Sequence, residues 1–290
     1  METSTPQKGL RFAFFGTPEF AVIVLDELEA TGYLPSLVVT APDRPRGRKL
    51  VVTPSEVKVW ASTHNIPCLT PEKLRDEAFL EELKKADCTL FIVAVYGKLI
   101  PKLALDMPIH GTLNVHPSLL PKFRGPSPVA SAILSEETRT GVTIMLLDEE
   151  MDHGPIVSAR EVTPRVWPPK GSELTNELAH VGGKLLAETL PHWLEAKEST
   201  PQEHAQATFT KKMTKEDGLI ELSGDPALNY KKIRAFDERP GAYFYAKRGD
   251  TMIRVRILDA LLEGGTLKLT RVIPEGKKEM PYEDFLRGMQ

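Results

Sequence analysis

Two polar side chains stand two positions apart near the middle of the chain, at Asn114 and His116. They fall at the end of a predicted strand, Thr112–His116, and alternate residues of a strand point to the same face of its sheet. An amide that donates a hydrogen bond, beside an imidazole that donates or moves a proton, suits acyl transfer, in which an oxyanion develops. The pair predicts an acyl-transfer site, although polar residues also cap many strand ends without any role in catalysis.

The loop that follows the next predicted strand, at 142–147, supplies a candidate acid. It reads Asp148-Glu-Glu-Met-Asp-His-Gly154. A carboxylate that reaches His116 would fix the ring tautomer and favour its protonated form. We expect Asp152 to have this role and the other acids of the loop to be solvated. His153 is expected on the surface, and because neither it nor His110 has partners at metal-ligand spacing, no metal is predicted.

Two other catalytic readings are weaker. Ser118 follows His116 by two positions and suggests a serine nucleophile, but the chain has no Gly-x-Ser-x-Gly elbow around it. The segment Gly16-Thr-Pro-Glu-Phe20 follows the first predicted strand without the spacing Gly-x-Gly-x-x-Gly. The absence of this phosphate-binding spacing argues against a nicotinamide oxidoreductase, the function that a Rossmann-like pattern would otherwise suggest.

A basic loop precedes the second predicted helix. Its positive charges come from Arg44, Arg46, Arg48 and Lys49, against one carboxylate at Asp43. Proline and glycine within it predict an irregular backbone. Such a loop suits contact with a phosphate backbone. A solvated loop that only aids solubility has the same composition, so both interpretations stay open.

Alternation of strands and helices positions these residues. Predicted strands cover 11–15, 37–40, 88–95 and Thr112–His116, and predicted helices open near Thr17, Thr53 and Thr70. The continuous apolar run at 88–95 is typical of a strand that is covered on both faces. The fold class is therefore α/β, with a Rossmann-like parallel sheet and helices on both faces. Ligands of such sheets bind at strand ends, where Asn114 and His116 lie.

The pattern changes at about residue 200. A helical pattern at 172–195 is followed by a polar stretch that we interpret as a linker. Beyond a short helix near 226–236, β-rich segments at 242–246, 251–258 and 266–273 predict a small barrel or sandwich. We therefore predict a catalytic domain at 1–200, a linker at 201–210 and a β-rich domain at 211–290.

Length, charge and cysteine content limit the class of protein. A chain of 290 residues suits two domains. The net charge is −3, yet residues 205–290 carry 16 Lys+Arg against 13 Asp+Glu, which hints at a polyanionic partner. No apolar stretch approaches the roughly 18 residues of a membrane span. We expect a cytoplasmic enzyme with no membrane partner, in which Cys68 and Cys88 stay reduced.

Five segments together resemble the 10-formyltetrahydrofolate-dependent formyltransferases. They are FGTPEF, DRPRGRK, VAVYGKLIP, LNVHPSLLPKFRG and MDHGPI, in this order along nearly the whole chain. The resemblance implies a catalytic triad of Asn114, His116 and Asp152, and 10-formyltetrahydrofolate as the formyl donor, with no metal. It also implies a folate site formed by Ala94, Val95, Tyr96, Gly97, Ser118, Leu119, Leu120 and Pro121.

The triad is common to the family, so it does not choose the acceptor. The basic loop and the segment that begins at Lys211 resemble the members that formylate initiator methionyl-tRNA. The resemblance implies an OB-like tRNA-binding domain at 211–290, and acceptor contacts from Phe20, Arg44, Arg46, Arg48, Lys49, Lys211 and Lys212. We expect a monomer. The chain departs from the family's common residues at Val129, Ala130, Leu146 and Pro155.

Three other functions remain open. An amino-sugar nucleotide N-formyltransferase or a formyltetrahydrofolate hydrolase would share the triad and would need no basic loop. A non-catalytic RNA-binding module would bind tRNA without folate-dependent turnover.

Overall fold

The computed structural model describes residues 9–47, 50–135 and 137–289. The chain divides into two compact units, each described here by itself. The first consists of Met1–Gly125, Thr140–Val162 and Asn176–Phe209, and the second of Pro126–Arg139, Thr163–Thr175 and Thr210–Gln290. The second unit thus includes two stretches, 126–139 and 163–175, from within the predicted catalytic domain. The division into domains at 1–200 and 211–290 stays a prediction.

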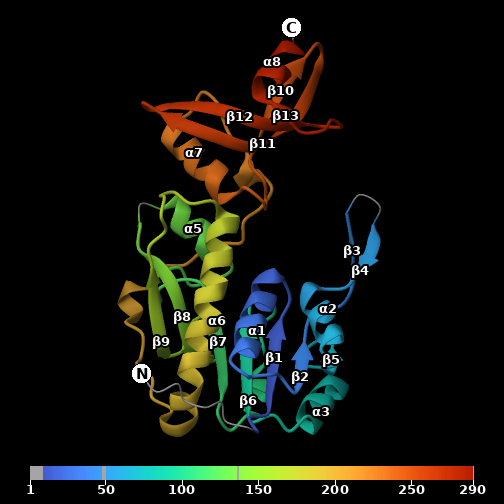
Figure 1. Ribbon diagram of the computed structural model, residues 1–290, viewed down its shortest axis with the longest axis vertical. Coiled ribbons are helices and arrows are strands. Elements are labelled where there is room, and N and C mark those ends of the chain that lie inside the picture. Colours follow the sequence, from blue (N-terminus) through green and yellow to red (C-terminus); the bar gives the residue numbers. More distant parts are fainter. Residues whose placement is uncertain (1–8, 48–49, 136, 290) are drawn as a thin grey trace. The chain divides into compact units, whose positions relative to one another are not determined.

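A seven-stranded sheet forms the centre of the first unit, in the order β5-β2-β1-β6-β7-β8-β9 (Figure 1). The strands are β1 (Phe12–Gly16), β2 (Leu37–Val39), β5 (Cys68–Leu69), β6 (Leu90–Ala94), β7 (Thr112–His116), β8 (Thr140–Leu146) and β9 (Ile156–Val162). Strands β5, β2, β1, β6 and β7 are parallel to one another, whereas β8 and β9 run antiparallel to their neighbours. The predicted α/β class is confirmed, with a mixed sheet.

The prediction of a wholly parallel sheet was wrong for the last two strands. β8 pairs antiparallel with β7, with Leu113 opposite Leu146, and β9 was not predicted at all. The loop 147–155 between β8 and β9 is too short to hold a crossover helix, so these two strands can only run antiparallel. An apolar run indicates a strand but carries no information about its direction.

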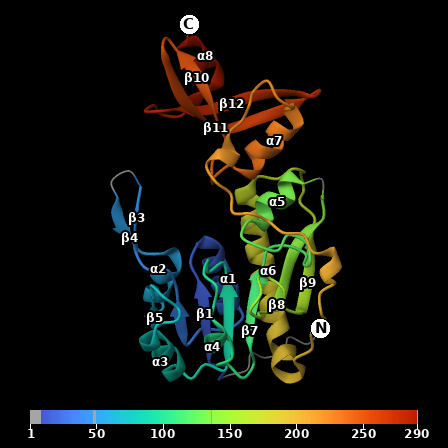
Figure 2. The same ribbon diagram turned by 180° about the vertical axis from the view of Figure 1, so that it is seen from behind.

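Helices cover both faces of this sheet. They are α1 (Glu19–Ala30), α2 (Glu56–Thr63), α3 (Glu77–Lys85), α4 (Lys102–Leu105) and the part of α6 (Gly171–Ala196) that belongs to the first unit. Ala13 and Phe15 of β1 share a buried cluster with Phe79 of α3 and Ala104 of α4. Helices α1 and α6 lie on the opposite face (Figures 1 and 2). None of the described helices is long and apolar enough to cross a membrane.

The third predicted helix begins later than expected. Thr70 was predicted to open it, but α3 starts at Glu77. The Lys98 ammonium donates hydrogen bonds to the backbone carbonyls of Pro71 at 2.7 Å and Glu72 at 2.9 Å. These contacts tie the segment before α3 to the loop that follows β6.

The basic loop is a hairpin, so the prediction of an irregular backbone was wrong. β3 (Arg44–Arg46) pairs antiparallel with β4 (Val51–Thr53), and Figure 1 shows the hairpin standing clear of the large sheet. Pro45 fits because a two-stranded ribbon leaves one side of each strand unpaired, where no N–H is needed. Helix α2 is capped two residues later than predicted, by Ser55, whose hydroxyl accepts the N–H of Lys58.

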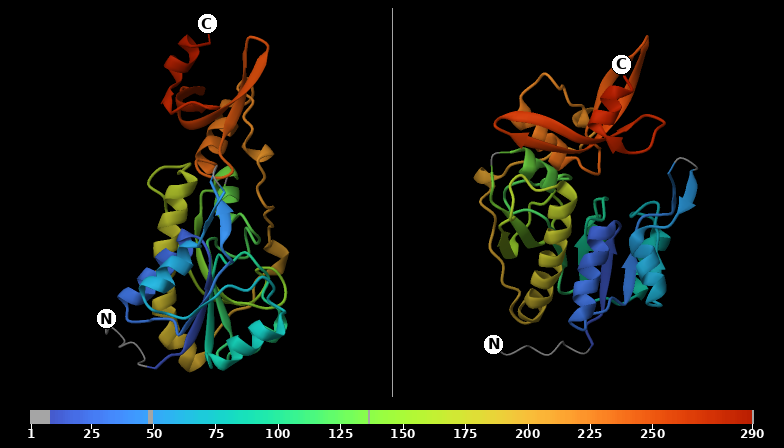
Figure 3. Two further views of the ribbon diagram at one scale, coloured as in Figure 1. Left: turned by 90° about the vertical axis from the view of Figure 1, so that its right-hand side faces the viewer. Right: turned by 45° about the horizontal axis from the view of Figure 1, so that its top comes forward.

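The second unit contains a four-stranded antiparallel sheet in the order β10-β11-β12-β13 (Figure 3). Its strands are β10 (Tyr243–Arg248), β11 (Thr251–Glu263), β12 (Thr266–Pro274) and β13 (Met280–Pro281), with helices α5 (Pro128–Leu134), α7 (Pro226–Ala235) and α8 (Tyr282–Arg287). Short 3₁₀ turns lie at η1 (His204–Gln206) in the first unit and η2 (Glu216–Gly218) in the second. The three longer strands match the β-rich stretches that the sequence predicts.

Candidate active site

Strand β7 places Asn114 and His116 on the face of the sheet that turns away from α6. Val115, between them, faces α6, where a Cβ added to Gly182 would lie 2.7 Å from its Cγ1 atom. The two polar side chains therefore point the other way, as their spacing predicts. Asn114 is 8% exposed and His116 4%. Both lie in surroundings that exclude most water.

Both ring nitrogens of His116 face oxygen acceptors. Nε2 lies 3.1 Å from the carbonyl oxygen of Phe123, and Nδ1 lies 3.7 Å from Oδ1 of Asp152. The first distance is a hydrogen bond, whereas the second is too long for one. A carbonyl oxygen only accepts, so Nε2 carries the proton of the first contact. The structure thus brings Asp152 beside His116, across a long separation in sequence.

Asp152 is held by its side chain and by an unusual backbone. Its Oδ2 atom accepts the N–H of Gly125 at 2.6 Å, and its φ of 51° lies in the left-handed region. Gly154 lets the loop return to β8, because a Cβ there would lie 2.0 Å from the carbonyl oxygen of Leu146. The position of the carboxylate therefore depends on a loop that tolerates little change.

The loop after β7 is fixed by hydroxyl groups. Ser118, 1% exposed, donates its hydroxyl to the carbonyl of Lys122 at 2.7 Å. Thr143 donates to the carbonyl of Ser118 at 2.7 Å and accepts the N–H of Leu120 at 3.1 Å. Because the Ser118 hydroxyl is engaged with a backbone carbonyl, it orders the loop and is not presented as a nucleophile.

The predicted folate residues after β6 adjoin the triad. Val93 of β6 is in register with Asn114 of β7, so the turn that follows Ala94 lies beside the end of β7. Val95 has a φ of 46° and is 41% exposed. Tyr96 is buried, its hydroxyl has no hydrogen-bond partner among the described residues, and burial raises the pKa of this phenol.

The residues predicted to contact the acceptor lie on several elements. Phe20 is buried in the first turn of α1, and Arg44 is exposed in the hairpin. Arg46 belongs to β3, while Arg48 and Lys49 lie outside the described residues. The structure therefore leaves the contribution of the hairpin tip to the acceptor site as a prediction.

Lys211 and Lys212 belong to the second unit and differ in their surroundings. The ammonium of Lys211 lies 2.7 Å from Oδ1 of Asp217. That contact, together with the N–H of Thr214, lowers the pKa of the Asp217 carboxyl to about 2. Lys211 is thus already paired within its own unit, whereas Lys212 is exposed.

Sequence reasoning missed two residues of the predicted linker. Gln202 is 5% exposed and donates to the carbonyl of Asp152 at 2.9 Å. The ring of His204 stacks on that of His153, with 4.2 Å between the centroids. His153 also lies 2.6 Å from Asp148, which is therefore paired and not a free loop charge. A glutamine in a polar stretch gives no sign of burial.

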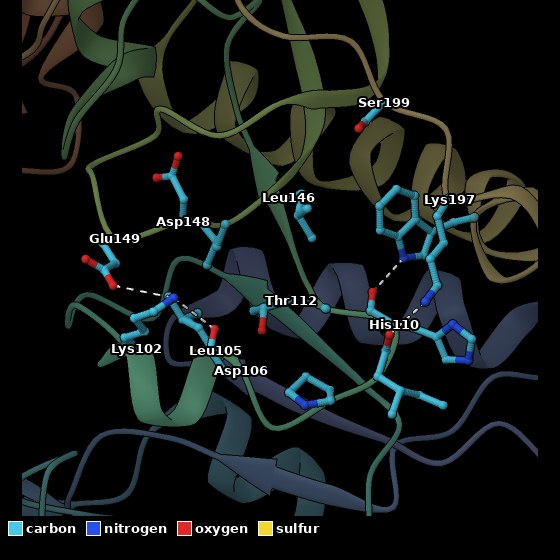
Figure 4. Close-up of a pocket in the computed structure, with 15 residues that line it drawn as sticks. Lys102, Leu105, Asp106, His110, Thr112, Leu146, Asp148, Glu149, Lys197 and Ser199 are labelled. Atoms are coloured by element: carbon cyan, nitrogen blue, oxygen red, sulfur yellow. Dashed lines mark hydrogen bonds and ion pairs between the residues drawn. The ribbon is translucent and has the colours of Figure 1, made fainter.

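A cavity of about 470 Å³ opens at the beginning of β7 (Figure 4). Thr112 lines it and, two residues before Asn114, lies on the same face of the strand. Figure 4 shows Lys102 and Glu149 on one side of the cavity and Lys197 on the other. The lining residues are Lys102, Leu105, Asp106, Pro108, Ile109, His110, Gly111, Thr112, Leu146, Leu147, Asp148, Glu149, Trp193, Lys197 and Ser199. The residues predicted to bind folate are not among them.

Two residues that line this cavity have a buried polar atom without a partner among the described residues. The Thr112 hydroxyl and Nδ1 of His110 are buried without a hydrogen bond to any other described residue. Leu105, Leu146 and Leu147 supply an apolar wall. Apolar walls with a few convergent polar atoms are typical of sites for small organic ligands.

Residues 10–190 match the family model described as formyl transferase. The chain belongs to the formyl transferase family. A methionyl-tRNA formyltransferase of Thermus thermophilus is 41% identical to this formyltransferase over 96% of each chain. Enzymes of this family are one-carbon group transferases.

Two solved structures share the fold of this formyltransferase. The methionyl-tRNA formyltransferase from Clostridium thermocellum has a TM-score of 0.62 at 16% identity, over 91% of this chain and 98% of its own. HypX from Aquifex aeolicus, solved in complex with tetrahydrofolic acid, has a TM-score of 0.67 at 19% identity. That match covers 96% of this chain and 47% of HypX, so the chain spans about half the length of HypX.

Proposed function

We propose that this formyltransferase moves the formyl group of 10-formyltetrahydrofolate to the free α-amine of initiator methionyl-tRNA. The similarity to the Thermus thermophilus methionyl-tRNA formyltransferase, which covers 96% of this chain, is the observation that supports methionyl-tRNA as the acceptor. The folate-derived donor is supported by the family and by the tetrahydrofolate complex of HypX. The chemistry is supported by the meeting of Asn114, His116 and Asp152.

The reaction begins when the α-amine attacks the formyl carbon. A carbon–nitrogen bond forms, and negative charge develops on the formyl oxygen. The Asn114 carboxamide makes no hydrogen bond to another described residue, so its N–H groups are available to this oxygen. A N–H of the His116 imidazolium is the second hydrogen-bond donor. Fixed groups of this kind act where charge develops, in a site that excludes water.

Collapse of the intermediate completes the transfer. The bond between the formyl carbon and the folate nitrogen breaks, and that nitrogen takes up a proton as tetrahydrofolate leaves. Asp152 supports the charged imidazole and assists the movement of the proton that the attacking amine loses. In the free protein the Phe123 carbonyl accepts from His116, so the formyl oxygen replaces it on binding. Catalytic hydrogen bonds often tighten only in the substrate complex.

We assign the folate to the region between the two predicted loops and the cavity at the start of β7. The loops contribute Ala94, Val95, Tyr96, Gly97, Ser118, Leu119, Leu120 and Pro121. The cavity suits a flat heteroaromatic ring, because Leu105, Leu146 and Leu147 supply an apolar wall.

We assign the tRNA to the hairpin and to the second unit. Arg44 and Lys212 are exposed cations suited to phosphates, with Arg46, Arg48 and Lys49 beside Arg44 in sequence. The four-stranded antiparallel sheet of the second unit supports an OB-like domain. Phe20 is assigned to the aminoacyl end through the first turn of α1.

One assay distinguishes the acceptors. Labelled formyl transfer from 10-formyltetrahydrofolate is measured in parallel with initiator methionyl-tRNA, elongator methionyl-tRNA, an amino-sugar nucleotide and no acceptor. We expect product with initiator methionyl-tRNA. Formylation of the sugar nucleotide, or formate release without an acceptor, would replace the proposed function by one of its alternatives.

Variants test the triad. Asn114→Ala, His116→Ala and Asp152→Ala should each lower single-turnover formylation by roughly 100- to 1000-fold, the typical loss for one oxyanion hydrogen-bond donor. Circular dichroism should show an intact fold. Asn176→Ala, on an exposed position of α6, is the matched control and should keep the full rate. Near-normal formylation by His116→Ala would rule out the assigned roles.

A further inference from the structure

The 200–209 segment, which covers most of the predicted 201–210 linker, is fixed to the rest of the first unit at both ends. Thr200 exchanges two backbone hydrogen bonds with Ile156, at 2.7 and 2.8 Å. At the other end, Thr208 accepts the N–H of Phe123 on its hydroxyl at 2.8 Å and the N–H of Arg124 on its carbonyl at 2.9 Å. The N–H of Thr208 also donates to the carbonyl of Pro121 at 3.3 Å, so the segment contacts the loop after β7 through the backbone of three residues.

Gln202 joins that loop to the loop of Asp152. Its Oε1 atom accepts from Nε and Nη2 of Arg124, at 3.1 and 2.7 Å. Its Nε2 atom donates to the carbonyls of Asp152, at 2.9 Å, and Gly154, at 2.7 Å. Four hydrogen bonds satisfy the carboxamide at a position that is 5% exposed. The orientation is unambiguous, because a flipped amide would aim its NH₂ group at a guanidinium.

Arg124 makes this contact costly to lose. The side chain is buried, at 3% exposed. Besides Gln202, Nη2 lies 2.9 Å from Nδ1 of His204, and the guanidinium carbon lies 5.9 Å from the centre of the Phe209 ring. A buried charge must be well hydrogen-bonded, so the Gln202 carbonyl is a principal support of Arg124.

The two backbone groups that hold the catalytic pair flank Arg124. The carbonyl of Phe123 accepts from His116, and the N–H of Gly125 donates to Asp152. Gln202 thus fixes Arg124, which lies between these two groups in the chain. It also binds the carbonyl of Asp152 directly. We propose that Gln202 is a positioning residue for formyl transfer, which sets the Asp152 carboxylate against His116 by tying both loops to the 200–209 segment. This inference rests on the proposed function.

Gln202→Glu separates the two halves of this contact. The carboxylate keeps an acceptor for Arg124 but loses both N–H groups and faces two carbonyl oxygens. We expect kcat to fall by about 100-fold, the scale of a misplaced reacting group, with the KM values for folate and tRNA little changed. Gln206→Glu is the matched control, with the same charge change at an exposed position of the segment, and should keep the wild-type kcat.

A double-mutant cycle distinguishes positioning from general destabilisation. If Gln202 acts through Asp152, then Gln202→Glu should cause little further loss of kcat in the Asp152→Ala background. The pH–rate profile of Gln202→Glu should also take the shape of the Asp152→Ala profile. An equal loss in both backgrounds overturns the inference.

Two further outcomes distinguish a failure of the positioning role of Gln202 from a failure of the proposed function. Full turnover by Asp152→Ala would refute the catalytic assignment itself, whereas an inactive Asp152→Ala beside a fully active, folded Gln202→Glu would refute only the positioning role. If Gln202→Glu fails to fold, Gln202→Asn keeps both amide groups on a shorter side chain. It should show an intermediate kcat, and a wild-type kcat would overturn the proposal.

Discussion

Asn114, His116 and Asp152 are held in three different ways. Strand β7 alone fixes Asn114, a backbone carbonyl engages His116, and the N–H of Gly125 holds Asp152. The amide is therefore ready for substrate in the free protein. The 3.7 Å separation between His116 and Asp152 has to shorten for a hydrogen bond to form between them.

Tyr96, one of the residues predicted to bind folate, offers a test at the level of one buried hydroxyl. This group is buried without a partner among the described residues. Removing an unsatisfied buried polar group should raise the free energy of unfolding of Tyr96→Phe by about 1 kcal/mol or more, measured by denaturant titration. Tyr245→Phe, at a 51% exposed position, should change little. A less stable Tyr96→Phe protein would indicate a partner for the hydroxyl in the free enzyme.

Short-range spacing made part of the site predictable. Asn114 and His116 share a strand, so period-two geometry alone puts them on one face. Gln202 could not be found in this way, because its partners Asp152 and Arg124 lie 50 and 78 positions away in sequence. The residues around Gln202 give no indication that its side-chain oxygen accepts hydrogen bonds from the distant guanidinium of Arg124.

The loop 147–155 is the element on which Asp152 depends. A Cβ at Gly154 would meet the backbone of Leu146, which cannot move aside as a flexible side chain can. We expect Gly154→Ala to shift the loop, destabilise the first unit and lower kcat by about 100-fold. Gly288→Ala is the control, since its nearest contacts would be ordinary, at 3.6 Å. Wild-type turnover by Gly154→Ala would show that the carboxylate tolerates a displaced loop.

The contacts of Asp217 in turn η2 make a pH-dependent contribution to the stability of the second unit. Lys211 and the Thr214 N–H hold the folded-state pKa of Asp217 at about 2, below its usual value of 3.8. A depressed pKa means that the stabilisation is fully present above 3.8 and is lost as the pH falls through about 2. The stability difference between wild type and Asp217→Asn should therefore shrink on acidification, by denaturant unfolding at several pH values. A difference that grows in acid would reverse this sign.

Several elements were predictable from pattern, and others were not. Helix α7 and the three long strands of the second unit follow from apolar periodicity and turn residues. The direction of β8 does not, because an apolar run carries no information about direction, and the half-exposed β9 was not predicted at all. The hairpin of β3 and β4 was missed because its proline and glycine are also typical of irregular loops.

Both units carry exposed cations, so tRNA binding should draw on the whole molecule. Arg44→Ala in the hairpin and Lys212→Ala in the second unit should each lower the salt slope of tRNA binding by about one unit. The double variant should lower it by about two, since each substitution removes one phosphate contact. Lys84→Ala, exposed on α3, is the control. An unchanged slope in either single variant would remove that residue from the interface.

The division into units shows where a linear sequence misleads. Helix α6 begins within the second unit and continues in the first. A Cβ at Gly171, its first residue, would lie 2.6 Å from the carbonyl oxygen of Ala235, so this end packs closely against α7. Such a contact between distant parts of the chain is invisible to composition, which changes only near residue 200.

The buried position of Gln202 also bears on protein engineering. Composition alone would make the 200–209 segment a natural splice point for hybrids between relatives, or for an inserted protease site or tag. A junction there would exchange the glutamine that ties two active-site loops together. Hybrids joined after Phe209, where the first unit ends, keep that glutamine with its own loops. A hybrid joined before Thr200 should keep its activity only if the incoming segment also supplies a glutamine at this position.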